Sequence, residues 1–304
     1  MQILNFGSLN LDYIYQVPHF LSPGETLAAT EQHIVPGGKG LNQSVALARA
    51  GAQVFHAGVI GLGGGQLKDV LTESGVNISL LEEKNVLQGN AIIQVNSTGE
   101  NCILLFGGSN RSIDCEQVHR TLESFGPGDI LILQNEVSCL KQMVETALDK
   151  KMQIILNPSP FDDSLTELPL GRLSWIFINE VEGRQLTGEE KAEDILAKIR
   201  CRYPDLKVVL TLGKEGSCCA VPGEEVIRQP IFPVQAVDTT AAGDTFTGYF
   251  IAAYAQGRPL SECMRRAAAA SAISVSRIGA SVSIPYAEEV DRLLTTGEML
   301  SRPS

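Results

Sequence analysis

The stretch at residues 234–250, "VQAVDTTAAGDTFTGYF", places three small residues directly before an aspartate and an apolar run. Ala241, Ala242 and Gly243 carry almost no side chain, so their backbone N–H groups can approach a ligand closely. The apolar run predicts a helix, whose unpaired N–H groups and positive dipole end face the same ligand. The stretch therefore predicts an anion-binding seat, beside which Asp244 either caps the helix or takes part in chemistry.

The composition is that of an ordinary soluble globular protein. The 304 residues are 44% hydrophobic and 19% charged, and a chain of this size buries roughly 75% of its unfolded surface. The formal net charge of −11 disfavours a nucleic acid or an anionic membrane as a partner, because both attract clustered Lys and Arg. The seven cysteines have no metal-ligand spacing and the chain opens without a signal peptide, so we expect a cytoplasmic protein with reduced thiols.

Short apolar runs alternate with helical stretches along most of the chain. The runs are "QILNFG" (2–7), "QVFHAGVIG" (53–61), "DILILQ" (129–134), "QIILNPS" (153–159), "WIFIN" (175–179) and "VVLTLG" (208–213). Stretches such as "LNQSVALARAG" (41–51) and "VSCLKQMVETALDKK" (137–151) carry apolar residues at helical spacing. This order predicts an α/β fold with a predominantly parallel central sheet, helices on both faces, and binding loops at the carboxyl ends of the strands.

Two segments interrupt the alternation. Residues 13–36 mix polar and apolar residues around "SPGE", and residues 90–106, "NAIIQVNSTGENCILLF", predict two strands around a Ser-Thr-Gly-Glu turn. We expect both segments to form a small β-sheet lid beside the main domain. Since no long linker, repeat or low-complexity tract is present, we expect residues 1–304 to form a single domain rather than two independent ones.

A second glycine cluster, "VPGGKGLNQSVALARAGA" (35–52), precedes an Ala-rich helix. It lacks the G-x-x-x-x-G-K-[ST] spacing of a P-loop. Taken alone, Gly37, Gly38 and Gly40 indicate either a ligand-binding loop or a tight turn with close helix packing.

Two polar pairs could hold ligands. Asn10 and Asp12 follow the first strand on alternate positions and so share one face, where an amide and a carboxylate can bind vicinal hydroxyls. As an isolated pair they are more often turn residues. Asn179 and Glu182 lie three apart at a predicted helix start, a spacing suited to holding water around magnesium, although a first-turn acid also stabilises a helix by itself.

Other reaction classes lack the motifs that they need. The run "GVIGLGGG" (58–65) departs from the G-x-G-x-x-G order, because Gln66 occupies the last glycine position, so a dinucleotide-binding dehydrogenase is disfavoured. The four histidines have no zinc-enzyme spacing, and Ser217 lacks a G-x-S-x-G elbow. Zinc and serine hydrolysis therefore have no support in the sequence.

Taken together, these motifs resemble the ribokinase family of sugar kinases, the pfkB-type carbohydrate kinases, over essentially the whole chain. The two signature regions stand here as "GGKGLNQSVALARAGA" and "VDTTAAGDTFTGYFIAAYAQG", joined in the same order by "GSLNLD", "LQNE", "NPSP", "NEVE" and "TLGKEG". The resemblance implies the ribokinase-like fold, with its small β-sheet lid.

The resemblance also implies the chemistry at each position. Asp244 corresponds to the base that takes the proton of the accepting hydroxyl, and the N–H groups of Ala241, Ala242, Gly243 and Asp244 correspond to the anion hole for the transferred γ-phosphate. Phosphoryl transfer needs this pairing, because the hydroxyl must be aligned and deprotonated while donors neutralise the phosphoryl oxygens. The implied sugar-binding positions are Asn10, Asp12, Gly38, Lys39, Asn42, Glu136 and Asp244.

The implied cofactors are ATP, Mg²⁺ and K⁺. The positions that match nucleotide contacts are Asn179, Thr211, Leu212, Gly213, Lys214, Glu215, Gly216, Gly243 and Ala267. Glu182 matches the acid that positions Mg²⁺ through water. The positions that match a monovalent-cation site are Asp238, Thr240, Ser274, Arg277, Gly279 and Ser283. By itself, "VSRIGAS" (275–281) instead indicates a helix that ends at Gly279, with Arg277 near its C-terminal dipole.

Two positions depart from the family pattern. The segment "GLGGGQ" (61–66) lacks the Asp that members often carry after the glycine that matches Gly61, and Leu41 replaces a small residue between two sugar-binding positions. We therefore expect Leu41 to bear on which sugar is bound.

The expected activity is ATP-dependent phosphorylation of a sugar primary hydroxyl, D-ribose to D-ribose 5-phosphate, by a homodimer that pairs through the lid. The alternatives are a kinase for another pentose, a hexose or a nucleoside, and a non-catalytic sugar-binding regulator with the same fold. The presence of Asp244, Glu182 and both glycine regions disfavours the regulator.

Overall fold

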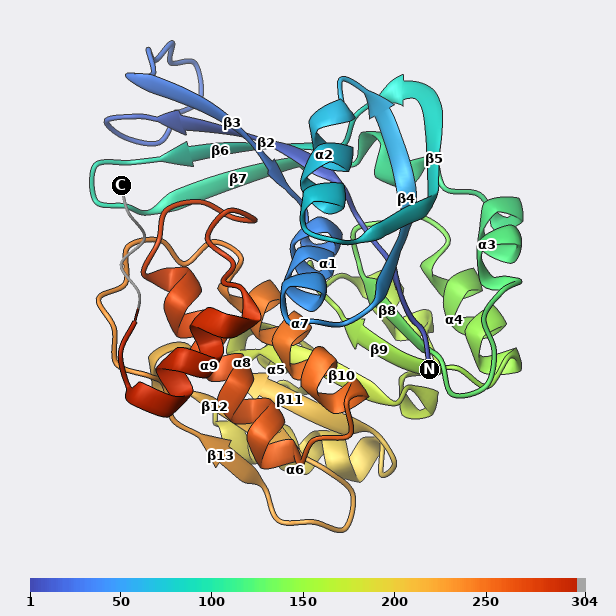
Figure 1. Ribbon diagram of the computed structural model, residues 1–304. Helices are drawn as coiled ribbons and strands as arrows, with labels where there is room; N and C mark the ends of the chain where they lie inside the picture. Colours follow the sequence, from blue (N-terminus) through green and yellow to red (C-terminus); the bar gives the residue numbers. More distant parts are fainter. Residues whose placement is uncertain (300–304) are drawn as a thin grey trace.

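The computed structural model describes residues 1–299. Within them, a nine-stranded sheet has the order β13-β12-β11-β10-β9-β8-β1-β4-β5 (Figure 1). Its strands pair in parallel except at one edge, where β12 and β13 run antiparallel. The strands are β1 (Ile3–Phe6), β4 (Val54–Leu62), β5 (Asn77–Leu87), β8 (Ile130–Gln134), β9 (Gln153–Asn157), β10 (Trp175–Asn179), β11 (Lys207–Thr211), β12 (Ser217–Ala220) and β13 (Ile227–Gln229).

The six apolar runs singled out in the sequence are six of these strands, β1, β4, β8, β9, β10 and β11. Successive side chains of a strand enter different cores: Ile3 and Ile130 pack on one face of the sheet, and Leu4 and Leu131 on the other. A strand that is buried on both faces has no polar side and therefore appears as a continuous apolar run. The sequence did not reveal the two edge strands, β5 and β13, or β12, which lies between β11 and β13.

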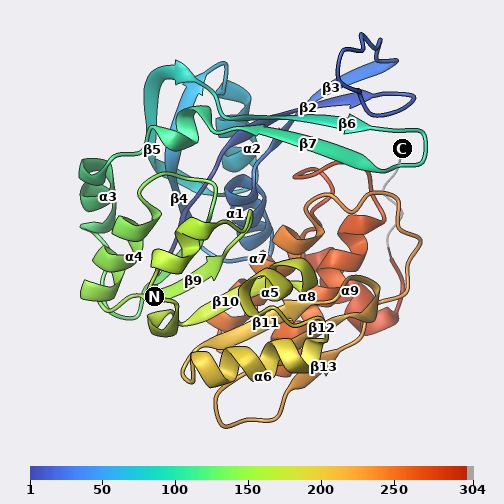
Figure 2. The ribbon, with the colours of Figure 1, turned by 180° about the vertical axis from the view of Figure 1, so that it is seen from behind.

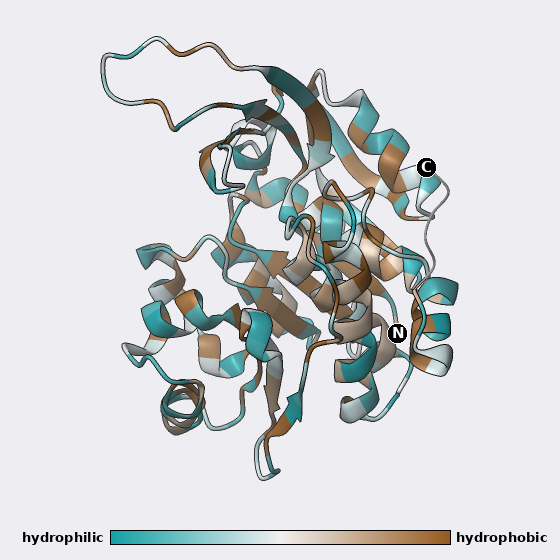
Figure 3. Ribbon diagram, turned by 90° about the vertical axis from the view of Figure 1, so that its left-hand side faces the viewer, coloured by the Kyte–Doolittle hydropathy of each residue, from teal (hydrophilic) through white to brown (hydrophobic). Residues whose placement is uncertain are grey.

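Helices cover both faces of the sheet, as predicted. One layer contains α1 (Lys39–Arg49), α2 (Gly65–Glu73), α7 (Ala242–Ala255), α8 (Leu260–Val275) and α9 (Ala287–Thr296). The other contains α3 (Cys115–Leu122), α4 (Leu140–Asp149), α5 (Glu180–Thr187) and α6 (Ala192–Arg202), and is seen from its own side in Figure 2. Figure 3 shows hydrophobic residues gathered in the central strands and hydrophilic residues on the outer helices. None of the helices within residues 1–299 is long and apolar enough to cross a membrane.

Helices α1 and α7, which follow the two glycine-rich segments, pack closely against each other. A Cβ atom added at Gly248 of α7 would overlap the Cβ of Ala46 on α1. Small residues at the crossing therefore let the two helices approach. Residues from the beginnings of both helices consequently reach one site.

A separate four-stranded sheet has the order β3-β2-β6-β7 and projects from the main body at the upper left of Figure 1. It contains β2 (Asn10–Gln16), β3 (Glu31–Gly37), β6 (Asn90–Val95) and β7 (Asn101–Phe106). The hairpin β6–β7 is the predicted pair of strands around the Ser-Thr-Gly-Glu turn. The sheet is mixed, because β2 pairs with β6 in parallel.

The register gives this small sheet two chemically different faces. Asp12, Val35, Ala91 and Leu105 form one row across the four strands. The neighbouring row, Tyr13, Ile34, Ile92 and Leu104, therefore points to the opposite face. Asn10 and Asp12 belong to strand β2 itself and not to a turn.

Candidate active site

The carboxyl ends of β9, β10 and β11 meet the beginnings of α1 and α7 around a cavity of about 230 Å³. Its walls include Lys39, Asn179, Glu182, Ala241, Ala242, Gly243 and Asp244. Thr211 also lines this cavity, so eight predicted site residues from four distant segments line one space. Carboxyl ends of parallel strands are where open α/β sheets bind ligands.

Asp244 lies in the first turn of α7 and is buried. Its Oδ2 accepts from Asn42 Nδ2 (3.1 Å) and its Oδ1 from Gln43 Nε2 (2.9 Å). Burial raises the pKa of this carboxyl, whereas the charge of Lys39 and the two amide donors oppose the rise. Both of these hydrogen bonds to the carboxylate thus come from residues of α1. It does not cap α7, whose N-cap residue, Ala241, makes no side-chain hydrogen bond to the helix end.

The beginning of α7 is shaped by a left-handed residue. Ala241 has φ of 59°, a conformation that is uncommon for a residue with a Cβ atom. Ala242 N donates to Thr239 O (3.2 Å), so one of the four expected anion-hole donors already has a partner. A Cβ atom added at Gly243 would meet nothing within 4 Å, which leaves open space directly at the helix end.

The predicted sugar-binding residues are held by a dense set of hydrogen bonds. Glu136 Oε2 accepts from the hydroxyl of Ser8 and from Lys39 N. Asn110 donates to Asn10 Oδ1 (2.7 Å) and so fixes its amide. A Cβ atom at Gly37 would overlap the carboxyl of Asp12, so glycine is needed at that position.

Three carboxyl groups and one lysine influence each other at this place. The pKa of Asp12 is raised to about 7, first by burial and then by the neighbouring charge of Glu136. Burial also raises the pKa of Glu136, against the charge of Lys39. The pKa of Lys39 is raised because the carboxylates, Asp244 foremost, outweigh its burial. A polar, water-poor site of this kind suits a ligand rich in hydroxyl groups.

Leu41 does not take part in this site. Its side chain is fully buried in the core with Leu9, Leu11 and Val45. Leu41 in the first turn of α1 therefore points into the core and lines neither cavity, so the structure gives it no contact through which it would choose the sugar.

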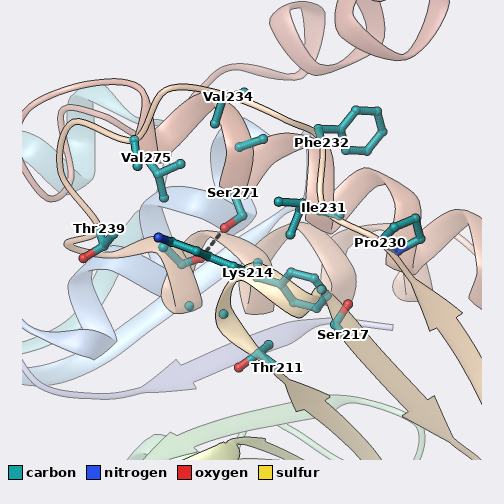
Figure 4. A pocket seen from close by; sticks show the side chains of 18 residues that line it. Thr211, Lys214, Ser217, Pro230, Ile231, Phe232, Val234, Thr239, Ser271 and Val275 are labelled. Carbon is teal, nitrogen blue, oxygen red and sulfur yellow. Dashed lines mark hydrogen bonds between the residues drawn. The ribbon is translucent and has the colours of Figure 1, made fainter.

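A larger cavity of about 410 Å³ lies on the other side of the helix end (Figure 4). Among the predicted nucleotide positions, Thr211, Gly213, Lys214, Gly216 and Gly243 line it. Its remaining wall is mostly apolar and comprises Pro230, Ile231, Phe232, Val234, Ala236, Phe246, Ala268, Ala272 and Val275, among others. Ser271 at its edge donates to Ala242 O (3.2 Å). A mostly apolar wall with a few polar residues suits an adenine base and its phosphates.

The other predicted nucleotide positions lie elsewhere. Ala267 is fully buried in the core, and the next residue, Ala268, lines the cavity. Leu212 packs against the second core, Glu215 is not part of the cavity lining, and Asn179 lines the smaller cavity.

Asn179 and Glu182 form a reciprocal capping box at the beginning of α5. Asn179 Oδ1 accepts from Glu182 N (2.9 Å), and Glu182 Oε2 accepts from Asn179 N (3.0 Å). Their three-residue spacing therefore stabilises the beginning of α5, which is the helix-stabilising role that the sequence left open as the alternative to magnesium binding. Glu182 is nevertheless in the wall of the smaller cavity, where an acidic oxygen atom suits a hydrated Mg²⁺ ion.

The two segments expected around a monovalent cation lie side by side. Val237 N and Asp238 N both donate to Val275 O (2.7 and 3.2 Å). Asp238 accepts from Thr240 N and Gly279 N, each at 2.9 Å. The carboxylate of Asp238 thus joins both segments and is adjacent to the residues that lead into α7.

The remaining predicted cation positions have side-chain partners of their own. The hydroxyls of Ser274 and Ser283 bond each other (2.8 Å), and Arg277 pairs with Glu289 (2.5 Å). Helix α8 ends at Val275, so Arg277 and Gly279 lie beyond it and the alternative of a helix to Gly279 is wrong. Backbone carbonyl oxygens are the ligands that these segments can offer a large cation.

Sequence reasoning missed several residues of the site. Asn157 and Ser159 from "NPSP" line the smaller cavity, and Gln43 contacts Asp244 directly. The signal for Gln43 was a polar residue inside an otherwise apolar helical stretch. Ser8 and Asn110 carried no such signal, because their partners are distant in the sequence.

Comparisons with known proteins show the family to which the chain is similar. The model of the pfkB family carbohydrate kinases matches residues 2–287. A ribokinase of Haemophilus influenzae is 36% identical over 292 residues, which cover 93% of this chain and 95% of that protein. A deoxyribokinase of Salmonella typhi is 30% identical over 318 residues, covering 98% and 100%. The structure of Arabidopsis thaliana ribokinase complexed with ribose and ATP has a TM-score of 0.84 at 30% identity, covering 97% of this chain and 98% of that one.

Proposed function

The chain belongs to the pfkB family of carbohydrate kinases, and we propose that it transfers the γ-phosphate of ATP to the primary hydroxyl of D-ribose, forming D-ribose 5-phosphate. The observation that carries the proposal is Asp244, a buried carboxylate in one cavity with Lys39 and the N-terminus of α7. A base, a cation and a row of N–H donors around one space are what phosphoryl transfer to a hydroxyl requires.

Asp244 acts as the general base in this reaction. Burial raises the pKa of its carboxyl, which strengthens it as a proton acceptor as long as it stays ionised. The donors Asn42 and Gln43 and the charge of Lys39 favour the ionised form. The hydroxyl proton goes to Asp244 as the hydroxyl oxygen bonds to the γ-phosphorus. The bond from the γ-phosphorus to the bridging β,γ-oxygen breaks, and ADP leaves.

The phosphate is received by the beginning of α7. Ala241, Gly243 and Asp244 line the smaller cavity at the positive end of the helix dipole, and we assign their backbone N–H groups to the phosphate, because the N–H of Ala242 already donates to Thr239 O. Lys39, which lines the same cavity, adds a positive charge. Mg²⁺, positioned through water by Glu182, supplies further positive charge to the phosphates when bound. The adenine base occupies the larger apolar cavity beside Phe232 and Ala268.

The sugar is held by Asn10, Asp12 and Glu136 under the small sheet, which we assign the role of a lid that excludes water. A ligand that lacks the matching hydroxyl leaves a buried polar group without a hydrogen bond, which weakens its binding. This site therefore selects a polyhydroxylated ligand. D-Ribose is supported by the ribokinases of Haemophilus influenzae and Arabidopsis thaliana. The Salmonella typhi deoxyribokinase makes 2-deoxy-D-ribose the second candidate.

One assay tests the proposal. ATP turnover is measured against D-ribose, 2-deoxy-D-ribose, other pentoses, hexoses and nucleosides, with the phosphorylated position read by ³¹P NMR. We expect the highest kcat/KM for D-ribose and a phosphate on its primary hydroxyl. Preference for another acceptor reassigns the substrate, whereas tight sugar binding without turnover indicates a regulator.

The small sheet also supports a homodimer. Its row Ile34, Tyr13, Ile92 and Leu104 lies on the face opposite Asp12, and Ile34, Ile92 and Leu104 are exposed. An apolar row that spans every strand of a sheet is unfavourable in water. We infer that the same row of a second copy of the protein packs against it.

Two further expectations complete the proposal. Potassium binds between residues 237–240 and 275–283, where it holds two segments beside the anion hole.

The reaction takes place in the cytoplasm, which suits seven cysteines that are all free thiols in the structure.

A further inference from the structure

A chain of buried amide groups leads away from Asp244 into the protein. Gln43 Nε2 donates to Asp244 Oδ1 (2.9 Å), and Gln43 Oε1 accepts from Gln134 Nε2 (2.7 Å). Gln134 Nε2 also donates to Asn5 Oδ1 (2.9 Å), and Asn5 Nδ2 donates to Gly40 O (2.8 Å). The three amide side chains have no exposure to solvent, so none of these bonds competes with bulk water.

The far end of the chain fixes its direction. The carbonyl of Gly40 can only accept, so Asn5 must present its NH₂ group there and its oxygen atom to Gln134. Gln134 must then present its NH₂ group to both Asn5 and Gln43. Gln43 is left with its oxygen atom toward Gln134 and its NH₂ group toward Asp244. A reversed Gln43 would place its oxygen atom against a carboxylate and two NH₂ groups against each other.

A branch of the chain is also defined. Asn5 Nδ2 also donates to Ser44 Oγ (2.8 Å), and the hydroxyl of Ser44 is hydrogen-bonded to His56 Nδ1 (2.7 Å). Burial lowers the pKa of His56 to about 3, so the imidazole is neutral. The branch therefore brings no charge toward Asp244.

We propose that Gln43, locked in one orientation by Gln134 and Asn5, is the positioning residue that holds Asp244 Oδ1 and directs the other edge of the carboxylate to the sugar hydroxyl. This inference rests on the proposed function of Asp244 as the base. It adds that the first turn of α1 fixes the orientation of the catalytic carboxylate through the polarity of three amides, because the row of hydrogen bonds starts at the carbonyl of Gly40 in that turn.

The charged groups that face Asp244 are separate from the chain. They are Lys39 at the beginning of α1, Asp12 on β2, Glu136 after β8 and Glu182 at the beginning of α5. None of them bonds Gln134. A change at Gln134 therefore alters the orientation of Gln43 without altering the charge around Asp244.

The test uses the full-length protein and Gln134→Met, which keeps the length of the side chain and removes its donor. Gln43 is then free to turn its oxygen atom toward a protonated Asp244. We expect kcat to fall about tenfold, because the base is still present but no longer correctly oriented. KM for the sugar should change less than about twofold. The acid limb of the kcat profile moves up by about one pH unit, as the loss of one bond to a charged group implies.

The matched control is Gln117→Met, which removes another buried glutamine that donates to Gly58 O and has no bond to the chain. It should leave kcat and the acid limb unchanged. If Gln134→Met does not fold, Gln43→Met is the second variant, with the same expectation. A folded variant with unchanged kcat and acid limb overturns the inference, and so does an equal loss with Gln117→Met.

A second readout does not depend on turnover. In protein labelled with ¹³C-aspartate, the carboxyl resonance of Asp244 is assigned by its absence in Asp244→Asn and titrated. We expect its midpoint to rise by about one pH unit in Gln134→Met, and an unchanged midpoint overturns the inference. Failure of the wild type to phosphorylate any sugar would instead overturn the proposed function, and the titration would still decide the role of Gln43.

Discussion

Asn42 donates its amide N–H to Asp244 Oδ2 at 3.1 Å, joining residues that are 202 positions apart in the sequence. One residue belongs to the GGKG segment and the other to the small-residue segment before α7. The sugar side and the phosphate side of the proposed reaction therefore share one carboxylate, which both segments orient.

The first prediction concerns the base. Asp244→Asn keeps the shape of the side chain but cannot take the hydroxyl proton, so kcat should fall by roughly 10²- to 10⁴-fold. Sugar affinity, measured by titration calorimetry, should change little. Asp69→Asn on the exposed face of α2 is the control, and near-normal turnover by Asp244→Asn would remove the base from the mechanism.

The second prediction concerns the pH dependence of stability. The pKa of Asp12 is about 7 in the folded protein, above its ordinary value of 3.8, chiefly because of burial. The folded state therefore binds this proton more tightly than the unfolded state, and the contribution of Asp12 to stability decreases as the pH rises from about 4 to about 7. Asp12→Asn does not titrate and removes this contribution.

Urea unfolding at pH 5 and pH 8 measures the effect in ligand-free protein. The wild type should lose more free energy of unfolding between these pH values than Asp12→Asn does. Equal losses would show that Asp12 titrates normally in the folded state.

The third prediction concerns Gly243, which lines both cavities. Because an added Cβ atom meets nothing within 4 Å and alanine favours helices, Gly243→Ala should keep or raise the melting temperature. The methyl group enters the ligand space, so kcat/KM for ATP should fall about tenfold. Gly65→Ala in α2, where the added atom also meets nothing, should likewise keep or raise the melting temperature but leave kcat/KM for ATP unchanged. Intact kcat/KM in Gly243→Ala would contradict the proposed phosphate position.

The fourth prediction is activation by potassium. Turnover should be higher in potassium than in sodium at equal ionic strength, because screening is then matched and only the identity of the ion differs. Asp238→Asn replaces an acceptor oxygen atom that joins the two segments and should reduce the response. Equal rates in potassium, sodium and tetramethylammonium would exclude the site.

The fifth prediction concerns the dimer. Light scattering at micromolar concentration should give twice the chain mass of 32.7 kDa. Leu104→Lys places a charge in the apolar row and should yield monomers. Ile103→Lys, on the same strand but the opposite face, should stay dimeric, and a monomeric wild type would refute the assembly without affecting the chemistry.

The central sheet and the position of the anion seat could be predicted from the sequence because local chemistry determines both. A strand buried on two faces is apolar at most positions, and such runs identified β1, β4, β8, β9, β10 and β11. Small residues before an apolar helix likewise identify an accessible helix end. The family signatures are local in the same sense.

Only the tertiary structure decided which side chains from distant segments meet at the site. Ala268 rather than Ala267 lines the larger cavity because helix packing, and not the motif, sets which residue faces the ligand. Leu41 enters the core for the same reason. The partners of Gln43 come from β8 and α7, 91 and 201 positions away, and the direction of their hydrogen bonds follows from a backbone carbonyl that no motif marks. A sequence shows which residues can donate and accept, but only the fold brings each donor to its acceptor.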